Sequence, residues 1–127
     1  MAGIKGHRED EVMTKQNTAI LFRQILAEIV KISKLIEGYK FEDFYRDEQT
    51  YSKVTNCIRS LDLMAHQIPT IIRVKYALLP WKELQALEEE VAQSDAVTRP
   101  RLIWQICTET LPRIQPLVEN LIEEVEK

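Results

Sequence analysis

Apolar residues recur every three or four positions along most of this 127-residue chain, which is the spacing of one face of an α-helix. The pattern predicts four main helices, at about residues 14–37, 47–68, 80–91 and 101–125. Only 3 glycines and 5 prolines are present, which favours long helices over turn-rich β structure. We therefore expect an all-α, four-helix up-and-down bundle.

The predicted helices are separated by residues that stop or start helical structure. Gly38 suits the C-terminal end of the first helix, and residues 47–50 can cap the second. Pro69 interrupts the second stripe, so the apolar run after it either continues past a kink or forms a second short helix. Pro112 and Pro116 predict a kink or brief break near Thr110 in the last helix.

The length predicts one domain, and the rest of the composition is that of an ordinary soluble protein. Residues 1–13 lack periodicity and are expected to form a flexible N-terminal arm, which leaves residues 14–127 as a single helical-bundle domain. No apolar run approaches the roughly 18 residues that span a bilayer, and the start lacks the apolar core of a secretory signal. Cys57 and Cys107 lie mid-stripe and are expected to be buried, reduced thiols. These features predict a cytoplasmic protein that does not associate with membranes.

Charge and motif content disfavour several classes of function. The formal net charge is −3, from 17 basic and 20 acidic side chains, whereas a nucleic-acid binder usually carries a basic surplus or stripe. The chain has no glycine-rich phosphate loop, no Cys/His metal spacing and no nucleophile elbow, so we expect no cofactor and no metal. The glutamate runs are interpreted as solvated helix faces. His66 lies four residues after Asp62, which predicts a local surface pair.

The stretch PWKELQALEEEVAQSDAVTRPRLIWQICTETLP, residues 80–112, resembles the HepT-like branch of the HEPN superfamily. That family typically reads P-W-R-E, then R-x-x-x-x-H followed one residue later by Tyr, then a Trp and T-x-x-L-P. Here Pro80-Trp81-Lys82-Glu83, Trp104 and Thr108-Glu-Thr-Leu111-Pro112 fall into place without a gap. The resemblance covers roughly residues 17–122. It implies a helical bundle that forms a homodimer with its cleft at the interface, and a nucleotidyltransferase-like protein as the candidate partner.

The family's active-site residues are replaced in this chain. Glu88 occupies the position of the family's Arg, Gln93 that of its His, and Asp95 that of the Tyr that its partner enzyme modifies with adenylate. The family's metal-independent RNA cleavage needs a group that moves a proton near neutral pH, which imidazole does and an amide cannot. It also needs positive charge where phosphate charge builds up. The resemblance thus predicts the scaffold without the chemistry.

The aromatic segment at residues 39–51 allows two interpretations. Phe41 and Phe44 could form a recognition patch, or they could plug the end of the bundle, which is how the resembling family uses its F-x-x-F segment. We favour the plug.

For function, the favoured hypothesis is a non-catalytic HEPN-like binding or structural protein, a partner of a nucleotidyltransferase in a toxin–antitoxin-type pair. One alternative is an active HepT-like ribonuclease toxin whose site has moved, with Arg99 and Arg101 as phosphate contacts. Another is a bundle that binds a nucleotide or small molecule between its helices. The residue pattern leaves these alternatives open.

Overall fold

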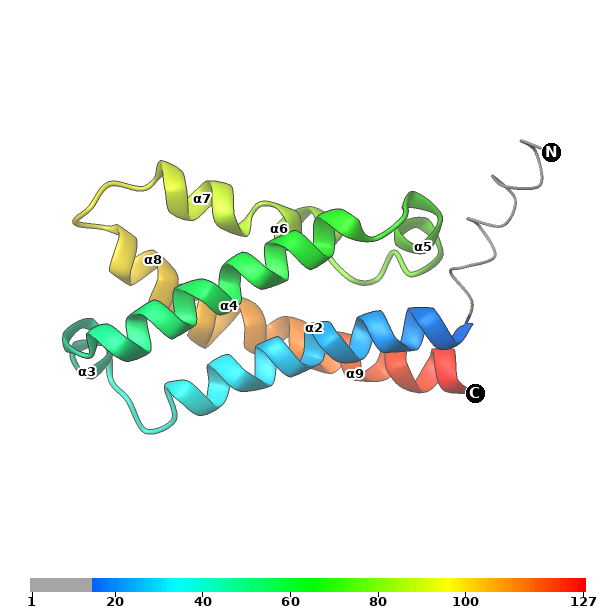
Figure 1. Cartoon of the computed structure of the whole chain (residues 1–127), viewed down its shortest axis with the longest axis horizontal. Coiled ribbons are helices and arrows are strands. Elements are labelled where there is room, and N and C mark those ends of the chain that lie inside the picture. Colours follow the sequence, from blue (N-terminus) through cyan, green and yellow to red (C-terminus); the bar gives the residue numbers. More distant parts are fainter. Residues whose placement is uncertain (1–14) are drawn as a thin grey trace.

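Four helical rods run alternately up and down in the computed structural model, which describes residues 15–127 (Figure 1). The first two rods are α2 (Lys15–Leu35) and α4 (Glu48–Gln67). The third consists of α6 (Trp81–Gln85) and α7 (Leu87–Gln93), and the fourth of α8 (Arg99–Gln105), η1 (Ile106–Thr110) and α9 (Leu111–Glu126). The short helices α3 (Phe41–Arg46) and α5 (Thr70–Lys75) lie at opposite ends of α4.

This architecture confirms the predicted all-α class, and no strand occurs within residues 15–127. The predicted N-terminal arm, residues 1–13, lies outside the described residues. No helix of the described part of the chain combines the length and the apolar character needed to cross a membrane.

The helix ends follow the chemistry of the residues found there. Gly38 has a φ of 77°, a left-handed conformation that residues with a Cβ rarely adopt, and it turns the chain out of α2. Asp47 caps α4, because its carboxylate accepts hydrogen bonds from the Thr50 backbone N–H at 3.0 Å and the Thr50 hydroxyl at 2.8 Å. The Tyr39 hydroxyl donates to the same carboxylate at 2.6 Å, which holds the segment after α2 against this cap.

Burial of the apolar stripes produces a continuous core. α2 packs against both α9 and α4, and α4 packs against α6 and α7. The largest fully buried side chains come from all four rods, from α3 and from the segment before α6: Phe22, Phe44, Ile25, Ile29, Ile32, Ile58, Leu61, Leu79, Leu84, Leu87, Ile103 and Leu111. Each such side chain contributes about 1.5–3 kcal/mol relative to exposure, which makes the stripes the main source of stability.

Aromatic clusters fill the two ends of the bundle. At one end Phe44 is fully buried, with its ring centroid 5.3 Å from those of Trp104 and Tyr51. Phe41 is half-buried and lies 6.4 Å from Trp104, so these two phenylalanines do close the bundle there. Toward the other end, Phe22 stacks on Trp81 at 6.0 Å.

Three helix boundaries add detail to the sequence-based prediction. Pro69 ends α4 and becomes the N-cap of α5, which decides between the two predicted alternatives in favour of a second short helix. The helix predicted to run on from Pro80 is interrupted at Ala86, and Pro80 precedes the first helical turn. Near Thr110, where a kink was predicted, the fourth rod contains the π-helical segment η1 and then continues as α9.

Candidate functional site

The candidate site is α7 with the loop that follows it, since the three replaced motif positions lie there. Leu87 and Val91 are buried and hold α7 against α4. The first turn of α7 is capped from another helix, because the Glu88 backbone N–H donates to Asp62 Oδ2 on α4 at 2.9 Å. This contact fixes the position of α7 relative to α4.

The Glu88 side chain lies at the boundary between α7 and α4. Its Oε1 accepts a hydrogen bond from Arg59 Nε at 3.3 Å, and its side chain is 36% exposed. Its Oε2 is sealed from solvent and has no hydrogen-bond partner among the described residues. Position 88 therefore carries a carboxylate that one arginine neutralises only in part.

Gln93 and Asp95 do not join α7 to α4 as Glu88 does, because each contacts residues close to it in the chain. Gln93 is exposed, and its amide donates to Glu89 one turn earlier at 3.2 Å. Asp95 Oδ1 accepts from the backbone N–H groups of Val97 at 3.0 Å and Thr98 at 2.8 Å. The Thr98 backbone bond, followed by that residue's side chain, lowers the pKa of Asp95 below its ordinary value. Asp95 thus shapes the turn into α8.

The two arginines named as phosphate contacts both bind within the protein. Arg99 donates through Nε to the Val91 carbonyl at 3.1 Å and through Nη2 to the Ser94 carbonyl at 2.6 Å, so it caps the C-terminal end of α7. The Arg101 guanidinium is exposed and lies 4.2 Å from the centre of the Phe41 ring, a cation–π contact. Their role as phosphate contacts stays a prediction.

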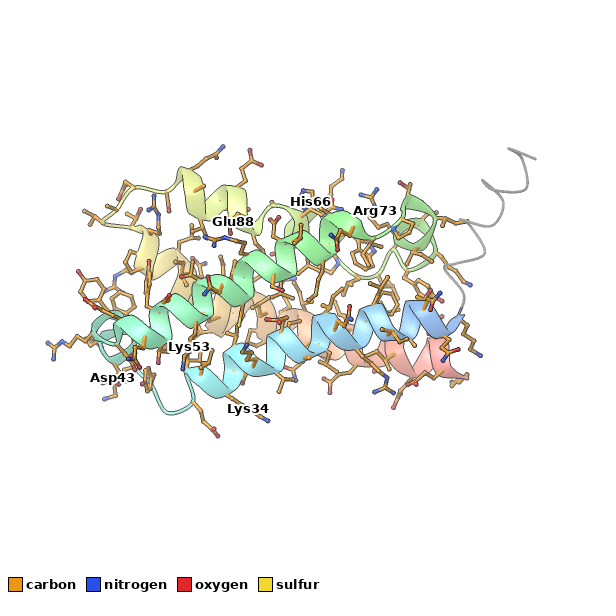
Figure 2. The ribbon with its side chains drawn as sticks, in the orientation of Figure 1. Lys34, Asp43, Lys53, His66, Arg73 and Glu88 are labelled. Carbon is orange, nitrogen blue, oxygen red and sulfur yellow. The ribbon has the colours of Figure 1, made fainter. Side chains whose placement is uncertain are left out.

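Asp62 links Glu88 to a histidine that the motif alignment does not include. His66 Nδ1 lies 2.9 Å from the Asp62 carbonyl oxygen and 3.2 Å from Asp62 Oδ1, which is the local pair predicted from their spacing. Arg59, Asp62, His66 and Glu88 together form a polar cluster between α4 and α7, which we call the α4–α7 cluster; Figure 2 labels His66 and Glu88. Sequence reasoning missed the link to Glu88. The spacing of three and four residues places Arg59, Asp62 and His66 on one face of α4, but it gives no signal of a contact with α7.

Comparison with known proteins finds relatives of low sequence identity that align over most of the chain. A protein of Caldanaerobacter subterraneus named "Putative RNase" is 21% identical over 100 residues, which cover 79% of this chain and 89% of the relative. Two proteins of Methanocaldococcus jannaschii with that name are 22% identical. One match covers 90% of this chain and 94% of the relative, and the other covers 91% and 99%. The chain resembles proteins named as putative RNases. It matches no protein-family model and no solved structure.

The cysteines contribute no reactive group to this site. Cys57 and Cys107 are both free and buried. Burial raises the pKa of the Cys57 thiol to about 11 and that of Cys107 to about 12, so both stay protonated at neutral pH. Among residues 15–127, no group of three or more His, Cys, Asp or Glu side chains could hold a metal ion.

Proposed function

We propose that this chain is a HEPN-like helical protein of the HepT-like type that acts by binding a partner and does not cleave RNA. Support comes from the similarity to proteins named as putative RNases over most of the chain, together with the helical fold. The observation that carries the proposal is the Glu88 carboxylate, which is half-buried and lies where the resembling family has an arginine.

The expected losses in catalytic rate at the two replaced positions favour binding over RNA cleavage. Loss of a general acid–base group costs about 10²–10⁴-fold in rate, and Gln93 offers only an amide at the family's histidine position. A carboxylate about 4 Å from a phosphate oxygen adds roughly 4 kcal/mol of repulsion at an effective dielectric constant of 20. Arg59 offsets part of that repulsion at Glu88, at a separation of 3.3 Å. The two replacements still act in the same direction, against cleavage at this position.

The test is incubation of the purified protein with single-stranded RNA in the presence of a chelator, with products separated on a denaturing gel. We expect no cleavage above that of a mock purification. If the protein cleaves RNA and the Gln93→Ala variant does not, the motif position is catalytic and the proposal is wrong.

A second candidate function is RNA cleavage from the α4–α7 cluster. One observation favours it, because His66 lies against the Asp62 carboxylate and Arg59 lies on the same helix, a combination that could move a proton and contact a phosphate. Arg99 and Arg101 would add phosphate contacts in that case. In the same RNA assay, cleavage that is lost in His66→Gln and kept in Gln93→Ala would favour this candidate.

The partner in the proposal is a nucleotidyltransferase-like protein, and the assembly is a homodimer. Co-expression with a minimal nucleotidyltransferase of the kind that the resembling family pairs with should give a complex that co-purifies, and light scattering should give the mass of two chains for this protein alone. Asp95 has no hydroxyl, so we expect no adenylate on its peptide by mass spectrometry. A monomer that fails to bind that enzyme would contradict this part.

A further inference from the structure

An open groove of about 750 Å³ lies between α5 and the start of α6. Its walls are mainly apolar and include Val74, Ala77, Leu79, Pro80 and Trp81. The volume is within the range of about 300–1,000 Å³ that small-molecule sites usually have. The surface beside it is also apolar, since Val74 is 72% exposed and Leu78 is 81% exposed. An apolar hollow of this size needs an occupant with an apolar body.

Arg73 lines this groove and supplies a guanidinium group to it. Its Nη2 donates to Thr70 Oγ1 at 2.8 Å. Its Nε is sealed from solvent and has no hydrogen-bond partner among the described residues. A ligand in the groove cannot reach a sealed atom, so Nε is not one of its contacts. A carboxylate there would be bound by the two terminal guanidinium nitrogens, Nη1 and Nη2, as a fork. Figure 2 shows Arg73 at the α5 end of the bundle.

The other polar groups of the groove leave its positive charge uncompensated. Glu83 is held by Arg113 at 2.6 Å, and the Gln85 amide donates to the Ala65 carbonyl at 3.0 Å. Lys82 also lines the groove, is exposed and has no ion-pair partner within residues 15–127. Among the described residues that line the groove, the one acid, Glu83, is therefore already paired, whereas Arg73 and Lys82 have no carboxylate partner.

We propose that this groove binds a small organic carboxylate with an aliphatic chain. The carboxylate lies on the guanidinium fork of Arg73 with Lys82 beside it, and the chain lies along Val74, Pro80 and Trp81. A single fork at one edge of an apolar hollow matches one anionic head and one apolar tail. This inference is independent of whether the chain cleaves RNA.

The test uses the whole protein and octanoate as the probe, with affinity measured by calorimetry and location by the indole N–H signals in two-dimensional NMR. Trp81 lines the groove, whereas Trp104 packs against Phe44 at the other end and is an internal control. We expect saturable binding that moves the Trp81 signal and leaves that of Trp104 in place. The neutral 1-octanol should bind at least about tenfold more weakly. Each methylene added between hexanoate and octanoate should strengthen binding by up to about fourfold.

Arg73→Gln should weaken octanoate binding at least about tenfold, because it removes the charged fork. Lys75→Gln is the matched control, since it removes the same charge two residues away, from a side chain that does not line the groove. It should change the affinity less than twofold. Arg73→Lys keeps the charge without the fork and should give an intermediate affinity, which maintains the test if Arg73→Gln does not fold. Absence of saturable octanoate binding, equal affinity in every folded Arg73 variant, or a shift confined to Trp104 would each overturn the proposal.

Discussion

At the scale of single residues, position 88 illustrates how one substitution changes what a scaffold can do. Glu88 contributes its backbone N–H to the Asp62 cap and its carboxylate to Arg59, so the residue holds α7 to α4 through two different groups. A side chain that joins two helices in this way has a structural role. The resembling family's arginine would bring a positive charge beside Arg59 and would require a different arrangement of α4.

Asp47 provides a residue-scale prediction about pH. The Tyr39 hydroxyl and then the Thr50 backbone N–H lower the pKa of its carboxyl from 3.8 to about 2. A carboxyl whose pKa is lower in the folded state stabilises the fold above its unfolded pKa and loses that contribution as pH falls from about 4 to about 2. Tyr39→Phe should therefore raise the Asp47 pKa, measured by carboxyl NMR. An unchanged value in that variant would show that the Tyr39 bond does not cause the shift.

The two thiols give a second prediction at this scale. Because burial raises the pKa of Cys57 to about 11 and of Cys107 to about 12, the native protein should react with Ellman's reagent at pH 8 at least about 100-fold more slowly than the denatured protein. A raised thiol pKa also stabilises the fold below the ordinary value of 9.0, and this contribution is lost as pH rises above it. Equal rates in native and denatured protein would contradict the burial of both thiols.

At the scale of elements, α7 depends on groups outside itself at both ends. Asp62 caps its first turn from α4, and Arg99 caps its last turn from α8. A helix of 7 residues is too short to be stable alone, so these tertiary caps and its two buried apolar residues decide whether it forms.

Removal of the Asp62 cap should loosen α7. Asp62→Ala should lower the free energy of unfolding by about 0.5–2 kcal/mol, because the Glu88 N–H loses its acceptor. Asp62→Asn is the matched control, since its amide oxygen can still accept that hydrogen bond, and it should retain most of the stability. Urea unfolding measures both variants, and hydrogen exchange at Glu88 should accelerate only in Asp62→Ala. Similar losses in the two variants would assign the effect to charge.

The elements also show which parts of the fold the sequence predicts and why others escape it. The four rods, the Gly38 stop and the Asp47 cap follow from local periodicity and local chemistry, and the structure confirms them. The break at Ala86 has no proline or glycine to announce it, and α7 restarts there with a cap that comes from 26 residues away. Sequence patterns report neighbours along a helix face, so a contact across two helices leaves no periodic signal.

The candidate site shows the same division. The spacing of Asp62 and His66 predicts their pair, whereas nothing local predicts that Arg59 and Glu88 meet across helices. The use of Arg99 as a cap for α7 also depends on the fold of the loop after Gln93. Arginines that are known only from the sequence are therefore weak evidence for a phosphate site until their partners in the fold are known.

At the scale of the whole molecule, the first and last rods join the two ends of the described chain. α2 and α9 pack along one another, and Arg23 donates to Glu126 at 2.5 Å near their ends. α9, part of the fourth rod, covers one side of α2 and so completes the bundle. The energetic weight of this closure lies in the apolar residues of α9, because exposed ion pairs contribute little.

Truncation tests this closure with a matched control inside the same helix. Ending the chain at Asn120 removes Leu121, Ile122 and Val125, which are 4%, 6% and 2% exposed. At about 1.5–3 kcal/mol for each buried side chain, the loss is about 5–9 kcal/mol. This approaches the entire stability of about 5–15 kcal/mol that a small domain has, so the shortened chain should lose cooperative thermal unfolding in circular dichroism.

Ending the chain at Val125 is the control for that truncation. It keeps the three buried residues and removes only Glu126 and Lys127, together with the Arg23–Glu126 ion pair and the hydrogen bond from Lys15 Nζ to the Lys127 backbone oxygen. It should unfold cooperatively, with a midpoint close to that of the full chain. If the two truncations lose the same stability, the polar contacts of Glu126 and Lys127, and not the apolar face of α9, hold the bundle closed. If neither truncated chain loses stability, the burial of α2 does not depend on the end of α9. The packing of the first rod against the last would then not be what completes the fold.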